Sequence, residues 1–373
     1  MKNKKITLLI LALCLTLASC APKKTKDSRV VLNSSYEEAI LKSRNLMIGS
    51  LITNRTGMSI TVTKGDECIW SQGLGYSSVE LESLVKPEHR FRIGTSSRLF
   101  ASLVLLRLHE RGEIDMQKKY TDYIKSGVNP TWSFTLYQLA VNSAGFPVSL
   151  HEILNESTHR NYLNLDSLLV AHASDALAYE PNRYFAESSF STCLLINALE
   201  EVSGKSYSKL LQEEVLTPFG LEETGLDYAN VILKNKASMY ARNSIAQLFR
   251  AADGNINAVS SAVGILSTAD DLNKLGQALM NRKVLTAESY QLLLTANILS
   301  NGEPTPWGMG LELSKDSQGR ELIVLRGMVT GGASLMLICP AEKFVMTVCG
   351  NLEGDYSSYP FTEVVEAFLG GKK

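Results

Sequence analysis

The spacing of apolar residues changes along the chain. Residues 59–75 alternate apolar and polar positions around a Lys-Gly-Asp turn, which predicts a β-hairpin. A short strand at residues 91–94 then runs into a predicted helix over residues 98–111, which is apolar on nearly every side. A helix of that kind is buried either in a protein core or in a membrane. Arg107 and His109 interrupt the apolar run, so the sequence favours the protein core.

Helical spacing dominates the middle of the chain, and strand character returns near its end. The predicted strands are residues 321–325, 333–339 and 344–349, and a closing helix is predicted over residues 361–369. Because strand runs and helix runs segregate, we predict an α+β fold. An antiparallel sheet built from both chain ends is flanked by helices and carries a mostly helical insertion. The α/β part is expected at about residues 41–115 and 255–370, with the insertion at about 116–254.

The first residues have the pattern of an export signal. Lysines near the N-terminus precede the apolar run 6–17, and Leu17-Ala18-Ser19-Cys20 follows. The apolar run is too short for a membrane span, which needs about 20 residues. The segment Leu17-Ala18-Ser19-Cys20 resembles the bacterial lipobox, in which the cysteine is lipidated. We therefore expect a signal peptide at 1–19, lipidated Cys20 with a flexible tether at 20–40, and a location in the cell envelope. The alternative is an ordinary secretory signal with an incidental cysteine.

Charge and cysteine usage exclude several classes of protein. Without the three leader lysines, 34 of the 37 basic residues face 38 acidic ones, and no basic patch indicates nucleic-acid binding. The histidines and cysteines show no metal-ligand spacing, so we expect neither a metal site nor a cofactor. Counting outward from the turn between the last two strands pairs Cys349 with Ser334, several residues from Cys339. We therefore expect the four remaining cysteines to be unpaired and mostly buried.

A series of motifs between residues 59 and 351 resembles one family in order. The motifs are FRIGTSSRLFASLVLLRLHERGEIDM, TLYQLAVNSAGFP, PNRYFAESSFSTCLL, LTPFGLEETG, AVGILSTADDLNKL and WGMGLEL. They are similar to the segments around the active site of the class C β-lactamase-like serine hydrolases, which include D,D-peptidases and esterases. The resemblance implies the β-lactamase/transpeptidase-like fold.

The catalytic positions of that family carry different residues in this chain. The resemblance places Thr95 and Arg98 at the serine and lysine of Ser-x-x-Lys, and Glu187 at the tyrosine that shuttles protons. The family's third motif, on an inner strand, falls near Arg326-Gly327-Met328. The residues expected to line a ligand site are Ser143, Ser188, Arg326 and Gly331.

These substitutions replace the family's lysine base by an arginine, although a Glu187 carboxylate facing Thr95 could itself act as a base. A hydroxyl becomes a useful nucleophile only if a nearby group accepts its proton. Arginine offers donors but no acceptor and stays protonated. The extra methyl group of threonine also stiffens the side chain. The simplest arrangement is an ion pair between Arg98 and Glu187 in place of the lysine and tyrosine hydrogen bond.

Two hypotheses for function follow. In the favoured one, the protein is a catalytically silent lipoprotein that binds a partner, or a peptidoglycan-derived or other small carbonyl-containing ligand, in the retained cleft. In the other, it is an active hydrolase of β-lactam, ester or peptidoglycan peptide bonds that is acylated on Thr95 or an adjacent serine. Covalent labelling distinguishes the two hypotheses.

Overall fold

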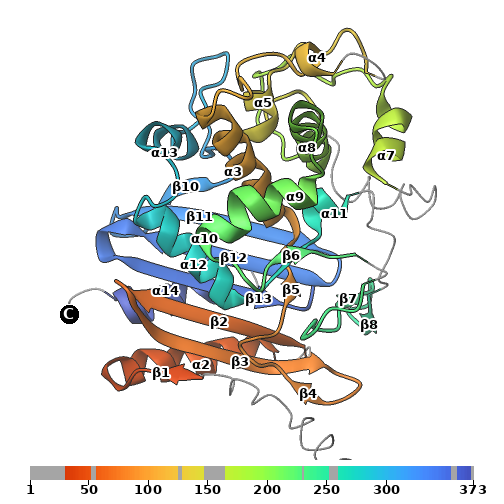
Figure 1. Ribbon diagram of the computed structural model, residues 1–373. Coiled ribbons are helices and arrows are strands. Elements are labelled where there is room, and N and C mark those ends of the chain that lie inside the picture. The colour runs from red at the N-terminus through yellow and green to blue at the C-terminus, as the bar shows by residue number, and fades with distance from the viewer. Residues whose placement is uncertain are drawn as a thin grey trace, which may run out of the picture.

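The computed structural model describes residues 30–51, 56–124, 128–146, 164–228, 231–251, 259–353 and 359–370. Its centre is an eight-stranded antiparallel sheet in the order β1-β3-β2-β13-β12-β11-β10, with β4 paired to β3 (Figure 1). The strands are β1 Val31–Leu32, β2 Gly57–Lys64, β3 Glu67–Ser78, β4 Ser83–Leu84, β10 Glu312–Lys315, β11 Glu321–Val329, β12 Gly332–Cys339 and β13 Phe344–Gly350. Because β13 pairs with β2, the sheet is built from both ends of the chain, as predicted.

Helices cover both faces of this sheet (Figure 1). One face packs on α2 (Glu37–Leu51) and α14 (Phe361–Leu369), and Val324 and Leu335 belong to that apolar cluster. The other face packs on α3 (Ser97–Glu110) and α12 (Ala269–Met280), together with Leu325 and Met336. Neighbouring residues of one strand therefore enter different cores, as the two-residue repeat of a strand requires.

The remaining described elements form the helical side of the molecule and two small sheets. The helices are α4 Tyr120–Tyr123, α5 Leu136–Ala140, α7 Leu165–His172, α8 Ser189–Ser203, α9 Tyr207–Leu211, α10 Thr217–Phe219, α11 Ser260–Val263 and α13 Ala287–Leu293. The short strands are β5 Phe91–Arg92, β6 Gly225–Leu226, β7 Tyr240–Arg242, β8 Leu248–Arg250 and β9 Ile265–Ser267. β6 pairs with β9, and β9 pairs with β5. The insertion is therefore less uniformly helical than its spacing predicts.

The folded unit begins earlier than the expected tether allows. Val31 pairs with Ser71 of β3, and α2 begins at Glu37. Residues 31–40 thus belong to the folded unit, and the boundary at residue 40 was wrong. A strand of two residues is too short to show a periodic pattern in the sequence. Strand β1 is recognised only from its pairing with β3. Residues 1–29, including Cys20, lie outside the described residues.

The cysteines follow the predicted register. Cys349 pairs with Ser334 across β12 and β13, while Cys339 lies opposite Phe344. The cysteines of the described part, Cys68, Cys193, Cys339 and Cys349, are all free thiols. The prediction of unpaired cysteines is confirmed for them. Within the described residues, no helix is long and apolar enough to cross a membrane.

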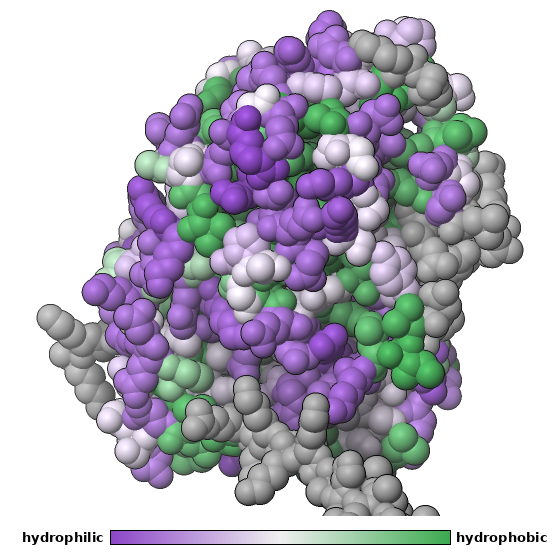
Figure 2. Space-filling model, viewed as in Figure 1, coloured by the Kyte–Doolittle hydropathy of each residue, from purple (hydrophilic) through white to green (hydrophobic). Residues whose placement is uncertain are grey.

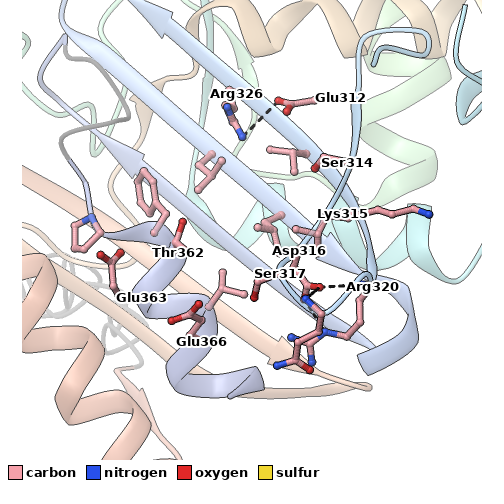
Figure 3. A pocket seen from close by; sticks show the side chains of 18 of the residues that line it. Glu312, Ser314, Lys315, Asp316, Ser317, Arg320, Arg326, Thr362, Glu363 and Glu366 are labelled. Atoms are coloured by element: carbon pink, nitrogen blue, oxygen red, sulfur yellow. Dashed lines mark hydrogen bonds and ion pairs between the residues drawn. The ribbon is translucent and has the colours of Figure 1, made fainter. Parts of the chain in front are cut away.

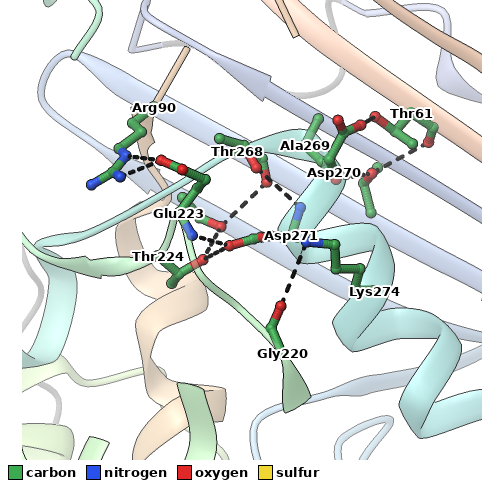
Figure 4. Close-up of polar contacts among 12 residues, drawn as sticks. Thr61, Arg90, Gly220, Glu223, Thr224, Thr268, Ala269, Asp270, Asp271 and Lys274 are labelled. Atoms are coloured by element: carbon green, nitrogen blue, oxygen red, sulfur yellow. Dashed lines mark hydrogen bonds and ion pairs between the residues drawn. The ribbon is translucent and has the colours of Figure 1, made fainter. Parts of the chain in front are cut away.

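Polar contacts fix α12 to the sheet and to the preceding turn (Figure 4). Asp270 accepts hydrogen bonds from Thr61 on β2 and from Ser71 on β3, the latter at 3.0 Å. Asp271 accepts from Thr224 Oγ1 at 3.0 Å and from the Glu223 N–H at 2.7 Å. These buried or partly buried carboxylates are hydrogen-bonded, as buried charges must be, and their role is structural.

Candidate active site

The turn before α3 brings Thr95 against the inner face of β11. Residues Gly94–Ser96 form a 3-10 turn in which no serine or threonine side chain caps the helix. Ser96 instead hydrogen-bonds to the Ser334 hydroxyl at 2.9 Å. The Met328 N–H donates to Thr95 Oγ1 at 3.4 Å. Gly94 has a φ of +61°, and a side chain there would collide with the Met328 backbone. Only glycine allows this close approach.

Arg98 lies one helical turn further along and is enclosed on three sides. Its side chain is 5% exposed, and its guanidinium forms an ion pair with Glu187, which confirms the predicted pair. Arg98 Cζ lies 4.6 Å from the ring centroid of Trp307, a cation–π contact. Nε is 3.5 Å from the Gly310 carbonyl oxygen. The guanidinium therefore fills the position of the family's lysine and cannot accept a proton there.

Two aromatic side chains support that guanidinium. Phe185 stacks on Trp307 with ring centroids 5.2 Å apart and an interplanar angle of 6°. Phe185 lies two residues before Glu187, so one segment supplies both the anion and the stacking partner of Trp307. Sequence reasoning did not bring Trp307 and Phe185 together. The available signal was an aromatic residue two positions before the substituted tyrosine position.

Asn142 positions the segment that carries Glu187. Its main-chain oxygen accepts from the Ala186 N–H at 2.9 Å, and its Oδ1 accepts from the Ser188 N–H at 3.2 Å. Asn142 adopts a φ of +53°, a left-handed conformation that asparagine tolerates better than most residues. Ser188 caps α8 by accepting from the Ser191 N–H at 3.3 Å. The Ser188 hydroxyl is therefore engaged in helix capping, while the residue also lines the small cavity beside Thr95.

Little space remains beside Thr95. A cavity of about 10 Å³ is bounded by Thr95, Arg98, Asn142, Glu187, Ser188, Ser189, Thr192 and Ala262. That volume is about enough for one water molecule. Arg98 Nη2 is buried and has no hydrogen-bond partner among the described residues. The two charged side chains that line the cavity are paired with each other, so neither is free to serve as a base for Thr95.

The predicted ligand residue Arg326 lies outside this site. Its side chain is on the α14 face of the sheet, 3.5 Å from Glu312, and lines a separate groove (Figure 3). The adjacent Gly327 is the residue that faces α3, because strand side chains alternate between faces. A Cβ on Gly327 would lie 2.0 Å from the Ile93 carbonyl oxygen. The resemblance located the strand correctly, but Arg326 is one residue out of phase with the site.

Gly331 and Ser143, two further predicted ligand residues, are both held by contacts within the fold. Gly331 forms the turn between β11 and β12 with a φ of +79°, and a Cβ there would meet Met239 at 2.4 Å. Ser143 is fully buried, and within the described part of the chain its hydroxyl has no hydrogen-bond partner. Its carbonyl oxygen accepts from the Asn182 N–H at 2.7 Å. Thr95, Arg98 and Glu187 are thus brought together, whereas Arg326 and Gly331 lie elsewhere.

The fold and the substituted motif define a β-lactamase-type hydrolase scaffold. The chain belongs to the β-lactamase family, whose model matches residues 45–367. Among curated proteins, the chain is 24% identical over 311 residues to the protein flp of Staphylococcus aureus (strain MW2), covering 80% of this chain and 60% of that protein. It is 23% identical over 302 residues to a D-aminopeptidase of Gluconobacter oxydans, covering 79% and 55% respectively. The chain therefore spans about 60% or less of the length of these relatives.

Solved structures show the same fold at low sequence identity. An octameric penicillin-binding protein homologue from Pyrococcus abyssi superposes with a TM-score of 0.77 at 21% identity, covering 89% of this chain and 78% of the other. FmtA from Staphylococcus aureus gives 0.76 at 20% identity, with coverages of 94% and 93%. A class C β-lactamase gives 0.75 at 16% identity, with coverages of 92% and 100%. The predicted β-lactamase/transpeptidase-like fold is confirmed.

Proposed function

We propose that this protein is a lipid-anchored, catalytically silent member of the β-lactamase-related serine hydrolase family that acts by binding. The observation that carries the proposal is the Arg98–Glu187 ion pair, which occupies both proton-handling positions of the family's site. Leu17-Ala18-Ser19-Cys20 supports the anchor, because the cysteine lies where a lipobox would place it. The acylating chemistry of the family needs a proton acceptor beside the hydroxyl, and Arg98 offers none.

The expected loss of turnover is large enough to favour an inactive site over a slow enzyme. Removing either the nucleophile or the base of a comparable hydrolase costs on the order of 10⁶ in turnover. Here the base is replaced by a permanent cation, and the nucleophile carries an additional methyl group. The Thr95 hydroxyl has the Met328 N–H as its hydrogen-bond donor. Among the residues that line the cavity, none is positioned to accept the proton of the Thr95 hydroxyl.

Ligand binding at this site would require movement of Glu187. The cavity holds about one water molecule, but the Glu187 side chain is 44% exposed at its mouth. Swinging this side chain outward would open space beside Thr95 and free the Arg98 guanidinium for a ligand oxygen. A peptidoglycan-derived or other small carbonyl-containing ligand fits that donor. Similarity to a protein named D-aminopeptidase supports a ligand with a peptide carbonyl.

The competing function is hydrolysis through an acylated Thr95. The observation in its favour is that Thr95 and Glu187 line the same small cavity, so a displaced Glu187 carboxylate would be near the hydroxyl. General-base catalysis would then require Glu187 to leave Arg98 and reach Thr95 instead. That step would leave the Arg98 guanidinium, which is 5% exposed, without its counter-ion.

Covalent labelling separates the two functions. We expect no adduct when the protein is incubated with a labelled penicillin, and no turnover of a chromogenic cephalosporin or an ester panel. The matched gain-of-function variant is Thr95→Ser/Arg98→Lys/Glu187→Tyr, which restores the family's residues at all three positions. We expect this variant to form an adduct, detected by intact-mass spectrometry.

The control is Thr95→Ala in each background. An adduct on the natural chain that Thr95→Ala abolishes would refute the silent-site proposal and establish the hydrolase. Failure of the triple variant to react, with its fold retained by circular dichroism, would show that more than these three residues separates the chain from active relatives.

A further inference from the structure

An exposed apolar hairpin projects from the molecule at one end of the central sheet. β7 and β8 form this hairpin, and its turn carries Ile245, which is 78% exposed. Phe249 on β8 is 47% exposed. Figure 2 shows the resulting hydrophobic patch at the lower right, where Figure 1 places β7 and β8. Large apolar side chains at such exposure, gathered together, indicate an interaction surface.

The turn holds Ile245 outward by hydrogen bonds. Asn243 Oδ1 accepts from the Ile245 N–H at 3.2 Å and from the Gln247 N–H at 2.9 Å. The Asn243 N–H also donates to the Gln247 carbonyl oxygen at 3.1 Å. Asparagine stabilises a turn in this way through its own side chain. Ile245 is therefore presented to solvent by an ordered turn.

A second loop adds apolar side chains at the same end of the sheet. The Ser238 N–H donates to the Ser77 carbonyl oxygen at 2.8 Å, and the Val79 N–H donates to the Tyr240 hydroxyl at 2.7 Å. These bonds fix the hairpin against the turn between β3 and β4. That turn exposes Leu81 by 78%, and β4 exposes Leu84 by 64%. We call the four side chains Leu81, Leu84, Ile245 and Phe249 the hairpin patch.

The described chain begins beside β3, the strand that leads to the hairpin. Val31 pairs with Ser71 and Leu32 with Trp70, in antiparallel orientation. Further along β3, the Ser77 carbonyl oxygen accepts the hydrogen bond from Ser238 just before the hairpin. Cys20 precedes Val30 by ten residues, a distance of at most about 35 Å when extended. A lipid on Cys20 would hold the bilayer within reach of this end of the sheet.

Basic residues accompany the hairpin patch and the preceding chain. Arg242 and Arg250 flank the turn and are exposed. Lys23, Lys24 and Lys26 lie just after Cys20. Anionic headgroups attract such residues near a membrane surface. Leu81 lies between Glu80 and Glu82, so the attraction to anionic lipid would come from the two hairpin arginines and the three lysines after Cys20.

We propose that the hairpin patch docks on the membrane surface and sets the orientation of the anchored domain. This inference rests on the proposed lipid anchor at Cys20. Apolar side chains flanked by arginines suit the boundary between headgroups and acyl chains. The contact can be weak, because an attached lipid turns docking into an intramolecular event at high effective concentration.

The test places a tryptophan reporter in the patch of the full lipidated protein. Phe249→Trp is reconstituted in phosphatidylethanolamine/phosphatidylglycerol vesicles whose acyl chains carry bromine, a contact quencher. The matched control is Val170→Trp, since Val170 is 71% exposed on α7, away from the hairpin (Figure 1). We expect the added emission of Phe249→Trp to fall by about half or more, because interfacial side chains enter the bilayer by ~5–10 Å. The Val170→Trp emission should stay unchanged.

Flotation of the vesicles distinguishes the two proposals. If the protein floats with vesicles but Phe249→Trp is quenched no more than Val170→Trp, the anchor stands and the docking proposal is overturned. If the protein does not float, both are overturned. A further refuting result is that Ile245→Ser converts a dimer into a monomer in analytical ultracentrifugation, because the patch would then bind a second copy instead of lipid.

Discussion

At the scale of single residues, the ion pair of Arg98 and Glu187 is asymmetric. Arg98 is almost fully buried, whereas Glu187 is 44% exposed. Trp307 and Gly310 hold the guanidinium independently of the carboxylate. Arg98 is therefore fixed by its surroundings, and Glu187 compensates its charge. This asymmetry explains why Glu187 is the member able to move.

The asymmetry predicts unequal effects of removing either partner. Glu187→Ala should lower the free energy of unfolding by about 1–3 kcal/mol, because it leaves a buried donor unpaired. Arg98→Met should cost less, since the exposed carboxylate can be hydrated and methionine retains an apolar contact with Trp307. Urea denaturation of both single variants and the double variant gives the coupling energy. A coupling near zero would contradict an energetically significant pair.

The sequence predicted this pair but not the environment that holds it. Substituting both proton-handling positions of a recognisable motif left a cation and an anion at adjoining sites, so their pairing followed. The stack of Phe185 on Trp307 joins segments more than a hundred residues apart, and no local pattern reveals it. Arg326 was misplaced because an offset of one residue along a strand moves a side chain to the opposite face.

At the scale of elements, the approach of β11 to the turn before α3 determines the site. Gly327 faces the Ile93 carbonyl oxygen at a distance that excludes a Cβ. The Met328 N–H then reaches Thr95 Oγ1. Hairpin β2–β3 and helix α14 were well predicted, because their periodicity is long and regular. Strands β7 and β8 were missed, since three-residue strands carry little periodicity.

Gly327→Ala should therefore be severely destabilising. The added Cβ would lie 2.0 Å from the Ile93 oxygen and 2.3 Å from the Ser96 nitrogen, both backbone atoms that cannot shift cheaply. We expect a loss of about 3 kcal/mol or more, in the range of the most damaging core changes. The matched control is Gly350→Ala in β13, where the nearest atom to the added Cβ is 3.5 Å away. Thermal unfolding should separate the two variants, and equal melting temperatures would refute the close approach.

At the scale of the whole molecule, the free thiols report both burial and processing. Burial raises the pKa of the Cys193 thiol to about 12 and also raises that of Cys349. Cys68 is only partly buried, and its desolvation, with a contribution from the Asp270 carboxylate, raises its pKa to about 11. Since the thiolate is the reactive form, all three should be poorly reactive in the folded protein at neutral pH.

The pH dependence and the thiol count then test two different claims. Near pH 8, a thiol with a pKa of about 11 carries on the order of 100-fold less thiolate than an ordinary thiol with a pKa of about 9. Alkylation of Cys68 in the folded protein should therefore accelerate as the pH rises toward 11, a gain that a Cys68→Ser variant lacks. Under the proposed anchor, Cys14 would be removed with the leader and the sulfur of Cys20 would be blocked by lipid, so the denatured protein should titrate four thiols with a chromogenic disulfide. A fifth titratable thiol that disappears in Cys20→Ala would show that Cys20 is retained without lipid, and the anchor would have to be abandoned while the buried-thiol result stood.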